Sequence, residues 1–138
     1  MLMQFILHNW SLFLALFVIL GMLAYKPVIQ AVYGIKNLPP PQAVLVMNRE
    51  DGIVVDVCEP KEYDQNHIVN AINLPLSALQ KRVGELDKYR GRPVIVSCRS
   101  GNRSVRGALI LRKHGFEKVY SLAGGILAWQ RDNLPVER

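Results

Sequence analysis

Cys98 lies where a strand-like run of residues meets the start of a helical pattern. The apolar, β-branched run 94–97 precedes it, and a short stretch with Arg99, Gly101 and Arg103 follows it. At that place a thiolate is stabilised by the free N–H groups and the dipole of the helix N-terminus, while the arginines attract an oxyanion. These residue types predict nucleophilic chemistry on an anionic substrate. The alternative is that Cys98 is a small buried apolar residue.

The charge pattern around Cys98 is strongly basic. Eight basic residues and no acidic residue lie from Lys88 to Lys113, and the whole chain carries a net charge of +6. A solvated basic face would give the same pattern, but its centre on a strand-end cysteine favours a field that draws an anionic substrate. No nucleic-acid-binding motif occurs and the aromatic residues do not interleave with the basic ones, so we do not expect nucleic acid as a partner.

Neither a metal nor another cofactor is expected. None of His8, His67 and His114 has metal-ligand spacing to a cysteine. The two cysteines, Cys58 and Cys98, lie far apart in the sequence and do not suggest a disulfide framework. This usage agrees with a reducing compartment, in which a cysteine has a chemical role more often than a structural one.

Strands and helices alternate along residues 35–138, and the strands are short continuous apolar runs. This alternation predicts the α/β class, with a small open parallel sheet of about five strands and helices on both faces. Ligands bind at the carboxyl edge of such sheets, where Cys98 is expected. The expected strands are 52–57, 71–75, 92–97 and 117–122. The expected helices are 42–50, 77–86, 104–115 and 124–132, and one or two helical turns are expected within 59–68.

Residues 1–25 differ in composition from the rest of the chain. They contain no Lys, Arg, Asp or Glu, and residues 5–25 form an apolar run of about 20 residues, enough to cross a bilayer as one transmembrane helix. A cleaved signal peptide would have basic residues before the run and an A-x-A pattern after it, and a buried soluble helix is rarely apolar all round. We therefore predict a transmembrane anchor at 1–25, a juxtamembrane linker at 26–34 and a folded domain at 35–138.

The charges that flank the apolar run predict its orientation. Lys26 and Lys36 follow the run, and no Lys or Arg precedes it. Because positively charged flanks stay inside, we expect a single-pass protein of the cell membrane with the folded domain in the cytoplasm.

Three blocks of the sequence together resemble the rhodanese family of sulfurtransferases. Residues 98–104, CRSGNRS, resemble the active-site loop of that family. Residues 54–75, VVDVCEPKEYDQNHIVNAINLP, resemble its first signature, and residues 122–136, LAGGILAWQRDNLPV, resemble its C-terminal segment. The resemblance implies a single rhodanese domain behind a membrane anchor.

The resemblance also implies an activity. In that family the loop cysteine takes a sulfane sulfur from a donor, becomes a persulfide and passes the sulfur to an acceptor nucleophile. By this match Cys98 is the catalytic nucleophile, the donor is a small anion such as thiosulfate or a persulfide, and the acceptor is a thiol or a protein. The implied substrate-binding residues, which act through loop N–H groups and two arginine side chains, are Arg99, Ser100, Gly101, Asn102, Arg103 and Ser104.

Other interpretations of the loop stay open. Cysteine phosphatases use a similar cradle, but with one residue more than the four that separate Cys98 from Arg103. Arsenate reduction by a rhodanese-like domain is a narrower alternative. A non-enzymatic, membrane-tethered binding module is a third, although the presence of Cys98 with both arginines argues against it.

Position 58 departs from the family pattern. Cys58 stands where the first signature usually has an arginine. Cys58 and Cys98 both follow strands of the predicted parallel sheet, so their thiols could meet. One hypothesis is that Cys58 is a resolving cysteine that attacks the Cys98 persulfide. The alternative is that Cys58 is a small space-filling side chain. Asp56, at the end of the same strand as Cys58, either orients the loop, pairs with an arginine or forms a strand-end turn.

Overall fold

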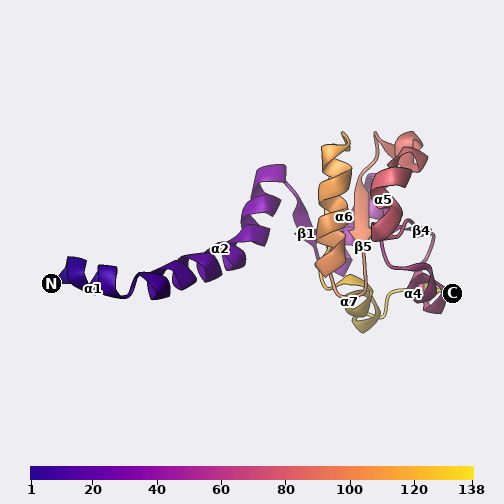
Figure 1. Cartoon of the computed structure of the whole chain (residues 1–138). Coiled ribbons are helices and arrows are strands. Elements are labelled where there is room, and N and C mark those ends of the chain that lie inside the picture. The colour runs from indigo at the N-terminus through magenta and orange to yellow at the C-terminus, as the bar shows by residue number, and fades with distance from the viewer. The chain divides into compact units, whose positions relative to one another are not determined.

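The computed structural model describes the backbone of residues 1–138 and all side chains except those of residues 26, 29, 30 and 33. The chain divides into two compact units, Met1–Val32 and Tyr33–Arg138 (Figure 1). The side chain of Lys26, on which the predicted orientation partly rests, lies outside the described residues.

The first unit consists of helices α1 (Leu2–His8) and α2 (Trp10–Tyr33). The chain bends by 76° at Asn9, whose side-chain amide donates to the carbonyl oxygen of Phe5 at 3.0 Å. The backbone N–H of Asn9 donates to the same carbonyl oxygen, so both groups of Asn9 cap the end of α1. Among the described residues no single helix is long and apolar enough to span a membrane, but the bent pair meets both requirements by length and composition. The apolar run is therefore a bent pair, not the one helix that its composition predicts.

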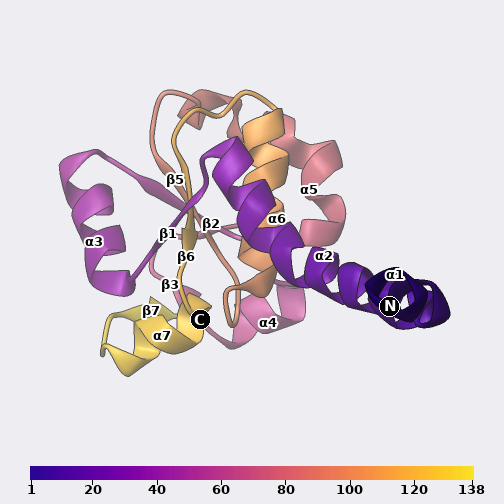
Figure 2. The same cartoon turned by 90° about the vertical axis from the view of Figure 1, so that its left-hand side faces the viewer.

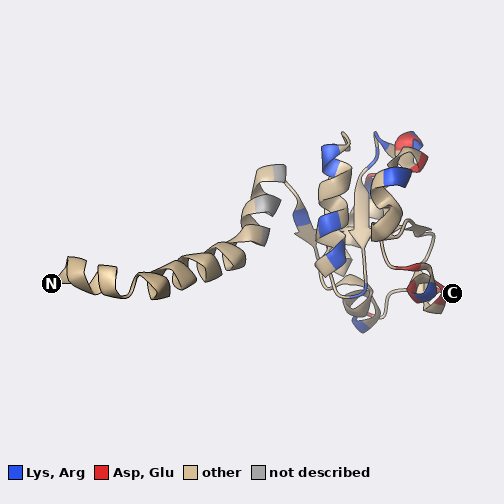
Figure 3. Cartoon of the chain, viewed as in Figure 1, with Lys and Arg blue, Asp and Glu red and all other residues tan. Residues whose placement is uncertain are grey.

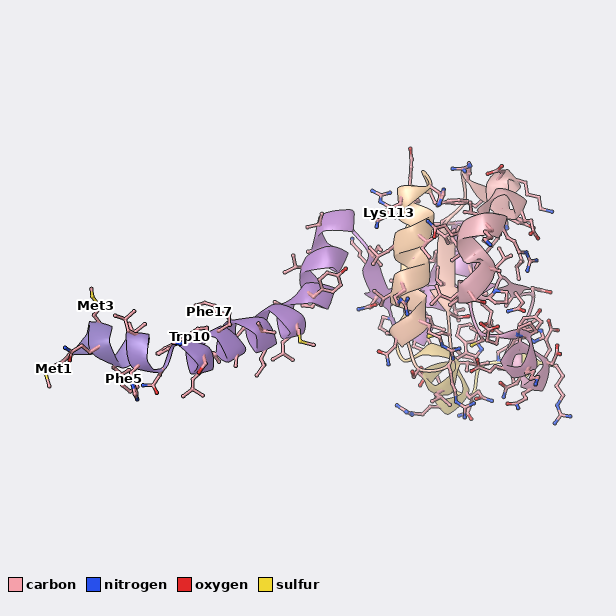
Figure 4. The ribbon with its side chains drawn as sticks, viewed as in Figure 1. Met1, Met3, Phe5, Trp10, Phe17 and Lys113 are labelled. Carbon is pink, nitrogen blue, oxygen red and sulfur yellow. The ribbon has the colours of Figure 1, made fainter. Side chains whose placement is uncertain are left out.

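The side chains of α1 and α2 are mostly exposed and apolar. Phe5, Trp10 and Phe17 project from the ribbon of these helices (Figure 4), and each is more than half exposed. Helix α2 continues through most of the segment expected as a juxtamembrane linker.

The second unit contains a five-stranded sheet in which every neighbouring pair is parallel. This confirms the predicted α/β class and the parallel sheet. The four expected strands are present, and the fifth, at one edge of the sheet, was not among the expected strands. In sheet order the strands are β1 (Lys36–Leu38), β6 (Val119–Leu122), β5 (Val94–Ser97), β2 (Ile53–Asp56) and β4 (Ile72–Asn73).

Helices cover both faces of this sheet (Figure 2). Helices α5 (Leu76–Arg82) and α6 (Asn102–Lys113), with the 3₁₀ helix η1 (Val83–Tyr89), pack on one face. Helices α3 (Pro40–Arg49) and α7 (Gly125–Arg131) pack on the other. Successive residues of a strand point to opposite faces of the sheet. On β5, Val94 and Val96 pack in the core under α5 and α6, and Ile95 packs in the core under α3 and α7.

A short helix and a second small sheet complete the unit. Helix α4 (Pro60–Gln65) follows β2, and strand β3 (His67–Ile68) pairs antiparallel with β7 (Val136–Glu137). The sequence did not predict this small sheet. His67 is buried in it, where its ring stacks on Tyr63 with 3.6 Å between ring centroids.

Candidate active site at the end of strand β5

Cys98 follows the central strand of the sheet directly. Strand β5 pairs with β2 on one side and β6 on the other, with Val96 opposite both Val55 and Ser121. Because all three strands run in the same direction, Cys98 lies at their carboxyl edge, as the sequence predicted. The side chain is 2% exposed and the thiol is free.

The loop after Cys98 turns a backbone donor toward the sulfur. The N–H of Gly101 donates to Cys98 Sγ at a distance of 3.0 Å, and helix α6 begins at the next residue. Gly101 has φ of 101°, in the left-handed region that favours glycine, and its Cα lies against the backbone of Gly124, since an added Cβ would come within 3.1 Å of Gly124 N. The sulfur thus meets a polar backbone group at the start of a twelve-residue helix.

The start of helix α7 holds the same loop from the other side. The N–H of Ile126 donates to the carbonyl oxygen of Cys98 at 2.8 Å, and that of Leu127 donates to the carbonyl oxygen of Arg99 at 3.2 Å. A Cβ on Gly125 would lie 2.4 Å from the Cys98 carbonyl oxygen, so only glycine allows this approach. The glycine pair in the sequence LAGGILAW was the available signal for this contact.

The other residues predicted to bind substrate have different surroundings. Arg99, Ser100 and Asn102 are exposed at the loop and the first turn of α6. Ser104 is buried: its hydroxyl donates to the Gly101 carbonyl oxygen at 3.0 Å and is 2.7 Å from the hydroxyl of Ser121 on β6. Its side chain therefore fastens α6 to the sheet. Lys and Arg recur along α6 (Figure 3).

Arg103 forms an ion pair with a residue that lies far from it in the sequence. Its two terminal nitrogens donate to the two carboxylate oxygens of Glu62, on helix α4, at 2.7 and 2.8 Å. The hydrogen bond from Arg103 lowers the pKa of Glu62 to about 2, and the same bond raises the pKa of Arg103. One terminal nitrogen of Arg103 also lies 3.8 Å from Cys58 Sγ. The sequence offers one signal for Glu62, its position three residues after Glu59 at the start of α4.

Cys58 lies beside a carboxylate at the end of β2. The N–H of Cys58 donates to Asp56 Oδ1 at 2.8 Å, and the amide of Asn73 donates to the Cys58 carbonyl oxygen at 2.9 Å. Burial, together with the charge and hydrogen bonding of Asp56, raises the pKa of the Cys58 thiol to about 12. Burial also raises the pKa of Asp56. The bond between Asp56 and Cys58 is that of a strand-end turn, one of the roles expected for Asp56.

A small cavity of about 20 Å³ lies next to the loop. It has room for about one water-sized group. Among the described side chains, no group of three or more His, Cys, Asp or Glu could hold a metal ion. The residues that line the cavity are Asp56, Cys58, Glu62, Gln65, Asn66, Arg99 and Ile126.

The Rhodanese-like domain family matches residues 41–132 of the chain. The chain belongs to the rhodanese-like family. This confirms the resemblance carried by the loop and its two flanking blocks. A sulfurtransferase from Allochromatium vinosum is 39% identical over 87 residues, which cover 63% of this chain and 79% of that protein. The thiosulfate sulfurtransferase GlpE from Glaesserella parasuis is 36% identical over 101 residues, which cover 73% of this chain and 92% of that protein.

Solved rhodanese structures have the same fold. The crystal structure of a rhodanese-related protein from Thermoplasma volcanium superimposes with a TM-score of 0.64 and 31% identity, covering 74% of this chain and 97% of that one. The rhodanese-like domain and its sulfurtransferase relatives together support sulfurtransferase activity in general.

Proposed function

We propose that this rhodanese-like chain is a membrane-attached sulfurtransferase in which Cys98 carries the transferred sulfur as a persulfide. The observation that carries the proposal is the environment of the Cys98 sulfur. The Gly101 N–H donates to it at 3.0 Å, directly before the start of helix α6. A persulfide keeps negative charge on sulfur, and N–H groups at a helix N-terminus stabilise such charge.

The proposed reaction has two displacement steps. The Cys98 thiolate attacks the outer sulfur of the donor, and the rest of the donor leaves with the electron pair of the broken S–S bond, as sulfite from thiosulfate or as a thiolate from a persulfide. An acceptor thiolate then attacks the outer sulfur of the Cys98 persulfide and releases the Cys98 thiolate. Each step replaces one S–S bond by another, so no external oxidant or reductant is needed.

We also propose that residues 5–25 attach the domain to the cytoplasmic face of the cell membrane. Support comes from the exposed apolar side chains of helices α1 and α2 and from the length and composition of the bent pair. Flotation with lipid vesicles tests attachment: the full chain is expected to float with the vesicles, and a chain that begins at Tyr33 is expected to stay behind. Equal flotation of the two would contradict attachment through this segment.

Mass spectrometry tests the persulfide directly. The full chain, purified in detergent, is treated with thiosulfate or with glutathione persulfide, and its peptides are mapped. We expect one added sulfur on Cys98, removed by cyanide or by a thiol. Cys98→Ser is expected to lose the adduct completely, whereas the matched variant Cys58→Ser keeps it.

Three outcomes would contradict the proposal in different ways. Formation of the adduct on Cys58 would assign the wrong nucleophile. Absence of an adduct with every sulfane donor, together with hydrolysis of a phosphate ester or reduction of arsenate, would favour the phosphatase or arsenate reductase alternative. Absence of all three activities would favour a binding module.

A further inference from the structure

We infer that Glu62 selects the sulfur donor, by holding Arg103 in an internal ion pair that disfavours the dianion thiosulfate relative to persulfide donors. This inference rests on the proposed function, because it concerns the donor of the Cys98 reaction. The sequence alone predicted two free arginines in the loop and therefore a strongly cationic pocket.

The geometry of the ion pair shows that it belongs to the site. Both carboxylate oxygens of Glu62 accept hydrogen bonds from Arg103, at 2.7 and 2.8 Å, which is the bidentate arrangement that an oxyanion substrate would otherwise take. Glu62 Oε1 also accepts the N–H of Glu59 at 3.3 Å, so the start of helix α4 fixes the carboxylate in place. The side chains of Arg103 and Glu62 are 34% and 30% exposed, which makes this ion pair less solvated than an ordinary surface pair.

The charge of this pair is constant at neutral pH. Because Arg103 lowers the pKa of Glu62 to about 2, the carboxylate stays ionised and the positive charge of Arg103 stays balanced. Arg99 is then the cation of the loop that has no ion pair among the described side chains. With Arg99 as the one available cation, the loop matches a singly charged donor better than the doubly charged thiosulfate.

The lining of the cavity beside the loop disfavours a second negative charge. Asp56 and Glu62 both contribute to it, and Arg99 is its one cationic side chain. A sulfonate group beside the loop would meet these carboxylates or would have to displace Glu62 from Arg103. In a persulfide the attacked outer sulfur is bonded to a second sulfur that bears an uncharged methylene group, whereas in thiosulfate it is bonded directly to the charged sulfonate group. The apolar Ile126 is a suitable neighbour for that methylene group.

Steady-state kinetics with two donors tests the inference. The full chain is assayed with thiosulfate and with cysteine persulfide, and the same is done for Glu62→Gln. Removal of the carboxylate frees Arg103, so kcat/KM for thiosulfate is expected to rise about tenfold, mainly through a lower KM. For cysteine persulfide we expect kcat/KM to change less than about twofold.

Two control variants separate donor selection from helix stability. Glu59→Gln removes one negative charge from the same end of α4, where Glu59 bonds to Ser77, and is expected to leave both donors unchanged. Glu62→Asp keeps the charge and is expected to keep the preference for the persulfide. A merely structural role of Glu62 would instead lower the activity with both donors in parallel.

The possible results are distinct. An unchanged or lower kcat/KM for thiosulfate in Glu62→Gln overturns donor selection while leaving the proposed function intact. Failure of the wild-type chain to form a Cys98 persulfide from either donor overturns the proposed function. In that case calorimetric binding of thiosulfate, which is expected to be about tenfold tighter in Glu62→Gln than in wild type, still decides whether Glu62 repels the dianion.

Discussion

The two cysteines of this chain follow neighbouring parallel strands, Cys98 one residue and Cys58 two residues beyond the strand end, and their sulfur atoms have different surroundings. Cys98 follows β5 and Cys58 lies just beyond the end of β2, at the same carboxyl edge of one parallel sheet, and both are buried. The sulfur of Cys98 accepts a backbone N–H from Gly101 and stands before a long helix. Burial, followed by the carboxylates of Asp56 and Glu62, raises the pKa of Cys58, while Arg103, 3.8 Å from the sulfur, lowers it.

The difference shows that position at the sheet edge does not by itself make a nucleophile. Backbone donors favour a negatively charged sulfur, and nearby carboxylates with burial favour the neutral thiol. A resolving cysteine must attack as a thiolate. Because burial and the neighbouring carboxylates raise the pKa of the Cys58 thiol to about 12, we predict the space-filling role for Cys58.

The largest expected effect is on the alkylation of Cys58. In a Cys98→Ser background, Cys58 is the single remaining cysteine. Because its pKa is raised from 9.0 to about 12, we expect iodoacetamide to label it about a thousandfold more slowly near pH 8 in the native chain than in urea. Alkylation quenched at a series of times and followed by mass spectrometry measures the labelling rates of Cys58 in the native chain and in urea.

The pH profile separates the effect of ionisation from that of limited access. Thiolate reactivity should rise about tenfold per pH unit and continue to rise above 9.0, as long as the chain stays folded. Asp56→Asn removes the neighbouring charge and should speed the labelling. A native rate that levels off near pH 9.0 would show that neither burial nor the neighbouring carboxylates raise the pKa of this thiol.

A smaller effect is expected when the Cys98 side of the comparison is disturbed. In Gly125→Ala the new methyl group would lie 2.4 Å from the Cys98 carbonyl oxygen, on a residue with φ of 58°. We expect a loss of about 3 kcal/mol in the free energy of unfolding and slower persulfide formation on Cys98. Urea unfolding and the rate of sulfur uptake measure the two effects.

Gly91→Ala is the matched control, since a Cβ there meets no atom within 4 Å. It should leave sulfur uptake unchanged. If Gly125→Ala had wild-type stability and wild-type uptake, the contact between α7 and the loop would have no part in shaping the site.

The fold was largely predictable because strand burial is periodic and continuous in this sequence. The apolar runs at β2, β5 and β6 face a core on both sides, so their composition alone marks them as central parallel strands. Strand β1 could not be predicted because its sequence, KNL, is not an apolar run. It is a strand because its backbone pairs with that of β6. The bend at Asn9 was not predicted because the mean hydropathy of a segment does not show where one helix ends and the next begins.

The parts of the candidate site that depend on local sequence could be predicted, and the parts that depend on contacts between residues far apart in the sequence could not. The position of Cys98 and the turn at Gly101 follow from the strand, loop and helix sequence around them. The pairing of Arg103 with Glu62, 41 residues away, does not, because a charge pattern along the chain cannot show which side chains meet. The basic run therefore predicted two available arginines where the structure leaves Arg99 as the unpaired one among the described ion pairs.

The smallest expected effect concerns the hydroxyl that fastens helix α6 behind Cys98. Ser104→Ala leaves the buried hydroxyl of Ser121 without its partner at 2.7 Å and removes the donor to the Gly101 carbonyl oxygen. The expected cost is about 1–2 kcal/mol of unfolding free energy, measured by urea unfolding. Ser100→Ala, at an exposed loop position, is the matched control and should cost far less. Ser104 contacts the Gly101 carbonyl oxygen of the loop and not Cys58. Ser104→Ala should therefore slow sulfur uptake on Cys98 slightly and leave the alkylation rate of Cys58 unchanged. Equal changes at both cysteines would mean that the two environments are coupled through α6.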